Sequence, residues 1–234
     1  MKKTSNSASP TQEAYAELQM AYDHFNHALF AGELPPCLIT LQRERRTLGY
    51  FSEQRFVSHD RVVTDEIAMN PSYFAVCGIE DSLSTLVHEM AHLWQHHYGK
   101  PGRARYHNRE WAEKMVSLGL TPSDTGQPGG KMTGDSMSHL IDAGGPFQKS
   151  CAKLLDRQFR LSWLDRFPPA DTLHEGATDL ADMMDMPDPS KPKNKSKRVK
   201  YQCPNCSSQA WGKPGLMLLC GVPECNARSM NPVL

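Results

Sequence analysis

Apolar side chains recur at helical spacing in several stretches of the chain. Between residues 12 and 30 they lie three or four positions apart, at Tyr15, Leu18, Tyr22, Phe25 and Leu29. This period predicts an amphipathic helix, which Gly32 and the following LPP segment end. The same spacing predicts a helix over 107–118, and a weaker pattern predicts another over about 148–165.

Short runs of strand-like composition follow the first helix. We expect strands at residues 37–42 (CLITLQ), 47–52 (TLGYFS) and 61–70 (RVVTDEIAMN). A mostly apolar helical stretch comes next, with Asp81 or Ser82 as its cap and Gly99 at its end. The pattern predicts an α+β domain with an N-terminal helix, a small three-stranded sheet and two further helices.

Composition and charge divide the chain into five parts. We expect a disordered N-terminus at 1–10, a domain at 11–120, a Gly/Pro-rich extension with weak helices at 121–185, a charged linker at 186–200, and a separate unit at 201–234. The Gly-, Pro- and Ser-rich part of the extension, up to residue 146, is expected to be a functional or a mobile loop.

The bulk charge indicates no partner, because Lys plus Arg and Asp plus Glu number 26 each. No apolar run approaches the roughly 18 residues of a membrane span, and the N-terminus lacks the apolar core of a signal peptide. We therefore expect a cytoplasmic protein without membrane contact. In a reducing compartment its seven cysteines would be free thiols or metal ligands.

The apolar helix carries the first chemical motif, STLVHEMAHLWQHHYG. His88 and His92 lie four positions apart, so they share a helix face and can bind one metal ion. Glu89 lies on the flank of the pair and can take a proton from a water beside the metal. A surface helix that happens to carry histidines is the alternative. The apolar neighbours favour burial, however, and buried polar side chains need a partner such as a metal.

His96 and His97 follow one turn later. His96 lies about 12 Å along the helix axis from His88 and roughly 80° around it, so the two cannot reach the same ion. We expect His96 and His97 to flank the cleft and to bind no metal.

A catalytic zinc site needs a third protein ligand. The metzincin pattern fails here, because Gln95 replaces its glycine and Tyr98 its last histidine. Glu110 or Glu113 could serve. His107 is the more persuasive candidate, since it starts the next predicted helix and the GKPGRARY turn could fold that helix back.

Four cysteines in the last unit have the spacing of a zinc ribbon. They form a CxxC and a CxxxxC pair separated by thirteen residues: Cys203, Cys206, Cys220 and Cys225. We expect them to hold a structural zinc ion, because so short a segment has little core without one. The other three, Cys37, Cys77 and Cys151, are expected to be buried apolar residues.

These motifs together resemble the SprT-like metalloproteases. The resemblance rests on HEMAHLWQHHYG, HNREWAEKM and the four cysteines, and upstream on LPPCLITL and RTLGYFS; it covers about 12–118 and 201–230. It implies a compact zincin-like domain plus a zinc ribbon. It also implies site residues: the catalytic zinc ligands His88, His92 and His107, and the base Glu89.

The family includes Spartan-type proteases, which degrade proteins crosslinked to DNA. The resemblance therefore implies a zinc-dependent endopeptidase with a protein or peptide substrate, and DNA as a candidate partner. The alternatives are a catalytically silent module that binds nucleic acid or protein, and a metal hydrolase with a non-peptide substrate. Intact Glu89 argues against the first, and the resemblance against the second.

Zincins commonly bind an extended peptide along a sheet edge beside the active-site helix. The last strand before that helix, 61–70, is the expected edge. A proline at Ile67 or Met69 should then impair cleavage more than zinc binding.

Residues 191–200 hold six positive charges in ten positions, a run that attracts phosphate without reading sequence. We expect nucleic acid to contact Lys195, Lys197, Arg198 and Trp211, with Tyr201, Lys213 and Arg228 as further rings and charges. A solvated lysine-rich spacer is the competing interpretation.

Overall fold

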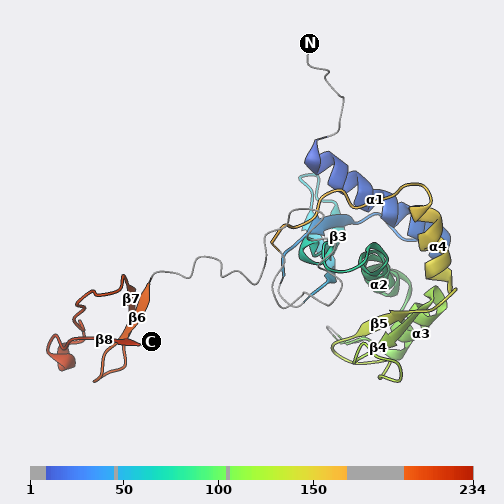
Figure 1. The fold of residues 1–234 in the computed structure, drawn as a ribbon. Helices are drawn as coiled ribbons and strands as arrows, with labels where there is room; N and C mark the ends of the chain where they lie inside the picture. Colours follow the sequence, from blue (N-terminus) through green and yellow to red (C-terminus); the bar gives the residue numbers. More distant parts are fainter. Residues whose placement is uncertain (1–8, 45–46, 104–105, 168–197, 234) are drawn as a thin grey trace, which may run out of the picture. The chain divides into compact units, whose positions relative to one another are not determined.

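The computed structural model describes residues 9–44, 47–103, 106–167 and 198–233. The chain forms two compact units, Met1–Pro187 and Asp188–Leu234 (Figure 1). Disorder was expected at 1–10: residues 1–8, like the predicted contacts Lys195 and Lys197, lie outside the described residues, whereas Ser9 and Pro10 begin a helix.

The first helix of unit 1 confirms the apolar period. α1 spans Pro10–Leu29, and Ser9 and Gln12 form a capping box at its start. Leu18, Tyr22 and Phe25 are buried along one face. These side chains anchor α1 to the core.

The three predicted strands form one sheet, but the expected edge is wrong. The strands are β1 (Leu38–Leu41), β2 (Gly49–Val57) and β3 (Val63–Met69), in the order β1-β3-β2. β3 is therefore central, parallel to β1 and antiparallel to β2. Its last five residues are all buried, as is typical of a strand paired on both sides. β2 is the edge that packs beside the motif-bearing helix.

The motif-bearing helix, α2, spans Ile79–Tyr98 and lies at the centre of unit 1 (Figure 1). Its N-cap is Gly78, so the prediction of Asp81 or Ser82 as the cap is wrong. Asp81 instead lies in the first turn, where a carboxylate stabilises the helix dipole. Gly99 ends the helix as predicted. A Cβ there would meet the Glu110 carboxylate at 2.5 Å, so a larger residue would displace that side chain.

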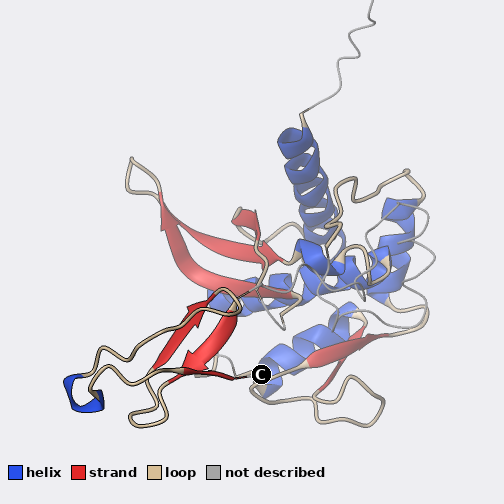
Figure 2. Ribbon diagram, turned by 60° about the vertical axis from the view of Figure 1, so that its left-hand side comes forward, coloured by secondary structure: helices blue, strands red, loops and turns tan. Residues whose placement is uncertain are grey.

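The chain then folds back as α3, which spans Arg109–Leu118 and is capped by the Asn108 side chain. The segment expected to be a loop contains a hairpin of β4 (Leu120–Ser123) and β5 (Ser138–Ile141). The two strands pair with each other over four residues, and the Gly/Pro-rich composition of the segment did not indicate this pairing. Figure 1 shows the hairpin beside α3, and Figure 2 shows the same strands in red.

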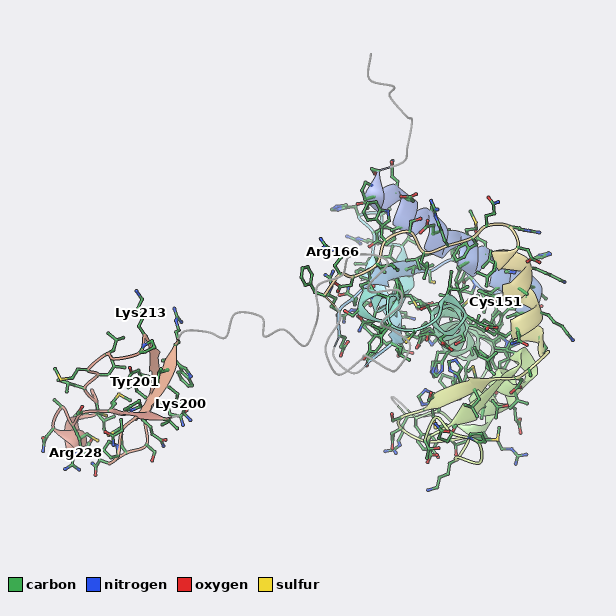
Figure 3. The ribbon with its side chains drawn as sticks, in the orientation of Figure 1. Cys151, Arg166, Lys200, Tyr201, Lys213 and Arg228 are labelled. Atoms are coloured by element: carbon green, nitrogen blue, oxygen red, sulfur yellow. The ribbon has the colours of Figure 1, made fainter. Side chains whose placement is uncertain are left out.

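α4 spans Pro146–Leu155 and packs against α1. The predicted helix over 148–165 is thus wrong beyond Leu155, after which Gln158 adopts a positive φ of 61°. Cys151 on α4 is buried, as expected (Figure 3), whereas Cys37 and Cys77 are half-buried. Among the described residues, no helix has both the length and the apolar character that crossing a bilayer requires.

The C-terminal unit is a small three-stranded sheet with long connections (Figure 2). Its strands are β6 (Val199–Gln202), β7 (Gln209–Gly212) and β8 (Asn231–Val233), in the order β7-β6-β8, with a short 3-10 turn at Pro223–Cys225. Its core is Tyr201, Met230 and three of the four cysteines. Such a core is too small to hold a fold without a further link.

Candidate active site and metal centres

Three histidines converge inside unit 1, on α2 and just before α3. His88, His92 and His107 each offer one ring nitrogen, and these atoms all lie within 4.8 Å of one another. The ring centroids of His92 and His107 are 4.7 Å apart, and those of His88 and His92 are 5.2 Å apart. Three imidazoles at such spacing can bind one metal ion.

The other candidate ligands point elsewhere. The Glu110 carboxylate accepts hydrogen bonds from the Lys100 amide at 2.6 Å and from Gln95 at 2.9 Å. Glu113 pairs with Arg109 on the exposed face of α3. The Gln95–Glu110 contact instead ties the end of α2 to the start of α3, which places His107 beside the pair on α2.

A hydrogen-bond chain fixes the ring of His88. Its Nδ1 lies 3.1 Å from Nδ1 of His139 on β5, whose Nε2 lies 2.8 Å from Oγ of Ser84. The Ser84 hydroxyl donates to the Asp81 carbonyl, so Nε2–H of His139 donates to Ser84. Nδ1 of His139 then accepts the proton of Nδ1–H of His88. This leaves Nε2 of His88 unprotonated and available to a metal.

The same extension fixes His107. Its Nδ1 lies 3.1 Å from the Gly134 carbonyl oxygen, and the two residues also exchange backbone hydrogen bonds. A carbonyl only accepts, so Nδ1 of His107 carries the proton and Nε2 is the ring's potential ligand atom. The segment between residues 121 and 146 therefore supplies the outer hydrogen bonds of two of the three histidines.

Trp111 on α3 packs against all three rings. Its ring lies 4.4 Å from His107, 4.9 Å from His88 and 5.1 Å from His92, centroid to centroid, and is fully buried. The tryptophan restricts the rotation of the imidazoles. The sequence assigned no role to Trp111, although it lies in the HNREWAEKM stretch, and it gave no sign of His139, which lies far from both motifs in the chain.

Glu89 lies buried beside this cluster, with 5% of its surface exposed. Burial raises the pKa of its carboxyl to about 8, and a hydrogen bond from the Phe51 amide of β2 opposes this shift. A cation held by the histidines would also favour the ionised carboxylate. Glu89 therefore lies between the edge strand and the histidines, where it can act on a water.

Burial lowers the pKa of the histidines and keeps them neutral. The pKa of His88 falls well below its ordinary value through burial and through the neighbouring His92, His139 and His107. Burial and His107 lower the pKa of His92 to about 3, and burial lowers that of His139 to about 4. Neutral imidazoles are the form that binds metal.

The four C-terminal cysteines form a second cluster, with ligand atoms within 4.8 Å of one another. The Sγ atoms of Cys203 and Cys225 are 3.8 Å apart, and those of Cys206 and Cys220 are 3.5 Å apart. A tetrahedron of Zn–S bonds of about 2.3 Å places its sulfurs about 3.8 Å apart. All four thiols are free, and their spacing fits a shared metal ion.

The predicted nucleic-acid contacts separate into exposed and buried residues. Trp211 is 59% exposed and pairs across the strands with Lys200, so ring and cation share one face. Tyr201 is buried and its hydroxyl donates to the Lys213 carbonyl, so the expectation that it stacks on a base is wrong (Figure 3). Alternation along β6 explains this, because neighbouring residues face opposite sides of the sheet.

Residues 18–127 match the model of the SprT-like family. The chain is also 64% identical over 59 residues to a Salmonella typhimurium protein described as an uncharacterized protein in the mucB 3' region. That match covers 25% of the chain and 80% of the relative. No solved structure matches the chain.

Proposed function

Because the chain belongs to the SprT-like family, we propose that it is a zinc-dependent endopeptidase whose catalytic ion is held by His88, His92 and His107. Family membership supports a metallopeptidase. The observation that carries the assignment to these residues is the convergence of the three imidazoles, with the buried Glu89 beside them. The fixed tautomers of His88 and His107 add to it, since both rings present Nε2.

Each part of the site has a chemical role in peptide hydrolysis. A zinc ion bound there would supply Lewis-acid chemistry, acidifying a water and polarising the scissile carbonyl. Glu89 would accept a proton from an attacking water and return it to the leaving amine. His139, Ser84 and the Gly134 carbonyl hold the ligand rings in place. Trp111 keeps bulk water from their inner side.

β2 supplies the edge for an extended substrate. Leu48, just before β2, and Tyr50 direct their backbone groups toward β3. The Leu48 carbonyl accepts from the Asn70 amide, and Tyr50 pairs with Ala68. Gly49 and Phe51 therefore direct theirs to the other side. The hydrogen bond from the Phe51 amide to Glu89 places that side against the active site. A peptide paired with β2 would lie beside the catalytic base.

The four cysteines would hold a second, structural zinc ion, giving one catalytic and one structural ion. A closed four-sulfur site leaves no position for a substrate. We further propose that this unit binds DNA and directs the protease to DNA-associated or DNA-crosslinked proteins. The support is the exposed Trp211 beside Lys200, with the basic run before β6.

The test of the peptidase is the Glu89→Gln variant. We expect it to lose casein cleavage by about two to four orders of magnitude, the contribution of a general base, while its zinc content by atomic absorption stays at the wild-type level. Cleavage at the wild-type rate would remove Glu89 from the mechanism. A wild-type protein that binds zinc but cleaves no peptide, with or without DNA, would favour the binding-module alternative.

A further inference from the structure

A third cluster of metal-binding side chains lies at the end of α2, in unit 1 but apart from the three converging histidines. Asp65 on β3 meets His96 and His97, and one ligand atom from each lies within 4.8 Å of the others. Nε2 of His97 is 2.7 Å from Oδ2 of Asp65. Two imidazoles and a carboxylate are a donor set that binds zinc and other divalent first-row metals.

We propose that Asp65, His96 and His97 form a second metal site in unit 1, specific for a divalent transition-metal ion such as zinc. The sequence led to the opposite expectation, because His96 and His97 cannot reach the ion of His88 along a straight helix. The structure shows that they turn instead toward a carboxylate from the sheet, which the helix by itself does not reveal.

The charge of Asp65 supports a bound cation. Its side chain is 7% exposed, and it accepts hydrogen bonds from the Gln54 amide at 2.7 Å and from His97. Among the residues that the structure describes, no lysine or arginine forms an ion pair with it. A divalent ion held between the two histidines would compensate the charge of this buried carboxylate.

The surroundings leave the site accessible and allow a fourth ligand. The side chains of His96 and His97 are 21% and 35% exposed, so an ion can enter from solvent. Oε2 of Glu53 on β2 lies 3.0 Å from Nδ1 of His96, and its side chain is 68% exposed. Glu53 or a water can therefore complete a tetrahedral site.

The site would link the active-site helix to the substrate edge. β2 is bulged between Ser52 and Phe56, where Gln54 has a φ of 47° and donates to Asp65. His96 also packs against Phe51, with ring centroids 5.9 Å apart. An ion held by Asp65 and the two histidines would fix this bulge relative to α2.

A plain hydrogen bond between His97 and Asp65 would explain one contact without any metal. The contact of His96 with Glu53 would likewise explain its position without a metal. The two explanations differ in metal stoichiometry, so we test them in full-length protein with the catalytic site removed by His88→Ala and His92→Ala. This background makes the result independent of the proposed peptidase activity.

At buffered free zinc we expect this parent variant to bind about two ions per chain, one at the four cysteines and one at Asp65, His96 and His97. A mercurial reagent displaces zinc only from thiolates, so the zinc that it releases measures the ion at the cysteines. Adding His96→Ala and His97→Ala should remove about one ion, the one that the mercurial does not release. Adding His27→Ala, at an exposed histidine of α1, should remove none.

Circular dichroism and the Tm in EDTA would show that the added changes leave the fold intact. If the double alanine variant misfolds, His96→Gln and Asp65→Asn repeat the test with smaller changes of shape. Zinc should also raise the Tm of the parent after the mercurial has occupied its thiols. A parent that binds zinc only at its cysteines, or a variant that keeps the second ion, overturns the proposal.

Discussion

His139 shows how a single residue far from a motif can control it. It lies 51 positions after His88, yet its ring hydrogen-bonds Nδ1 of that histidine and is held in turn by Ser84. Residues that orient a metal ligand fix its tautomer and its ring plane. We therefore assign His139 a positioning role in the catalytic site.

Replacing His139 tests this role at the residue scale. Because a lost outer hydrogen bond weakens metal binding, His139→Ala should weaken catalytic zinc affinity by about 10–100-fold, measured by chelator competition. His139→Gln, which can accept the same proton, should recover part of the affinity. The control is His59→Ala, at an exposed histidine. Unchanged zinc affinity in His139→Ala, with its metal-free Tm also unchanged, would remove His139 from the site.

The third ligand can be identified in the same assay. His107→Ala should lose the catalytic zinc, because its ring completes the set of three imidazoles. Glu113→Ala should keep it, since Glu113 faces solvent and pairs with Arg109. Glu110→Ala should show at most a mild loss through the contact between α2 and α3. A full equivalent of catalytic zinc in His107→Ala would contradict the assignment.

At the scale of elements, the order of the strands decides where a substrate can bind. The strand-like composition of β1, β2 and β3 was legible in the sequence, but their pairing was not. β3 takes the central place because it pairs with β1 on one side and with β2 on the other. A proline at Ile67 or Met69 would therefore disrupt the sheet itself and could not test the edge.

Substrate pairing with β2 is better tested by modifying the peptide. N-methylation removes one backbone hydrogen bond, and alternate amides of a paired strand face opposite sides. Methylating one alternate set near the cleaved bond should raise KM about fivefold per amide, while the other set should have little effect. Cleavage rates across both sets of peptides provide the measurement. An equal effect of both sets would exclude strand pairing.

At the scale of the whole molecule, the chain joins a compact domain to a separate small unit. The small unit has few buried apolar side chains, so a metal ion at its cysteines would be its main stabiliser. Although apolar side chains are few in this unit, Trp211 on β7 is exposed. An exposed ring beside a lysine is the arrangement that single-strand binders use.

The salt dependence of DNA binding should distinguish phosphate contacts from the stacking of bases on Trp211. Changing Lys195, Lys197 and Arg198 to Ala in the full-length Glu89→Gln protein should reduce the slope of log K against log salt by about 2 for single strands and about 3 for double strands, since each phosphate contact releases counterions. Trp211→Ala should weaken single-strand binding by about 1–3 kcal/mol and leave the slope unchanged. Fluorescence anisotropy with labelled single and double strands measures both.

The control for the ring is Trp163→Ala, at a tryptophan of unit 1 that is 48% exposed. This change should leave DNA binding unaltered. If the full-length protein binds neither strand type at low salt, DNA is not its partner, and the C-terminal unit is better explained as a protein-docking or structural module.

The sequence by itself determined the features that depend on neighbours within one helical turn or one short loop. The pair His88 and His92 shares a helix face whatever surrounds it, and the spacing of the four cysteines likewise indicated a common site. The periods of α1, α2 and α3 were legible for the same reason. Such contacts follow from backbone geometry alone.

Only the tertiary structure decided which distant residues meet. It brought His107 rather than Glu110 to the histidine pair, placed His139 behind His88, made β3 central, and turned His96 and His97 toward Asp65. None of these contacts has a local period, because each depends on how separate elements pack and pair. The physical reason is that backbone geometry within one helix or strand sets the direction of a side chain. Its neighbours from distant parts of the chain are set by how helices and strands pack to bury their apolar faces.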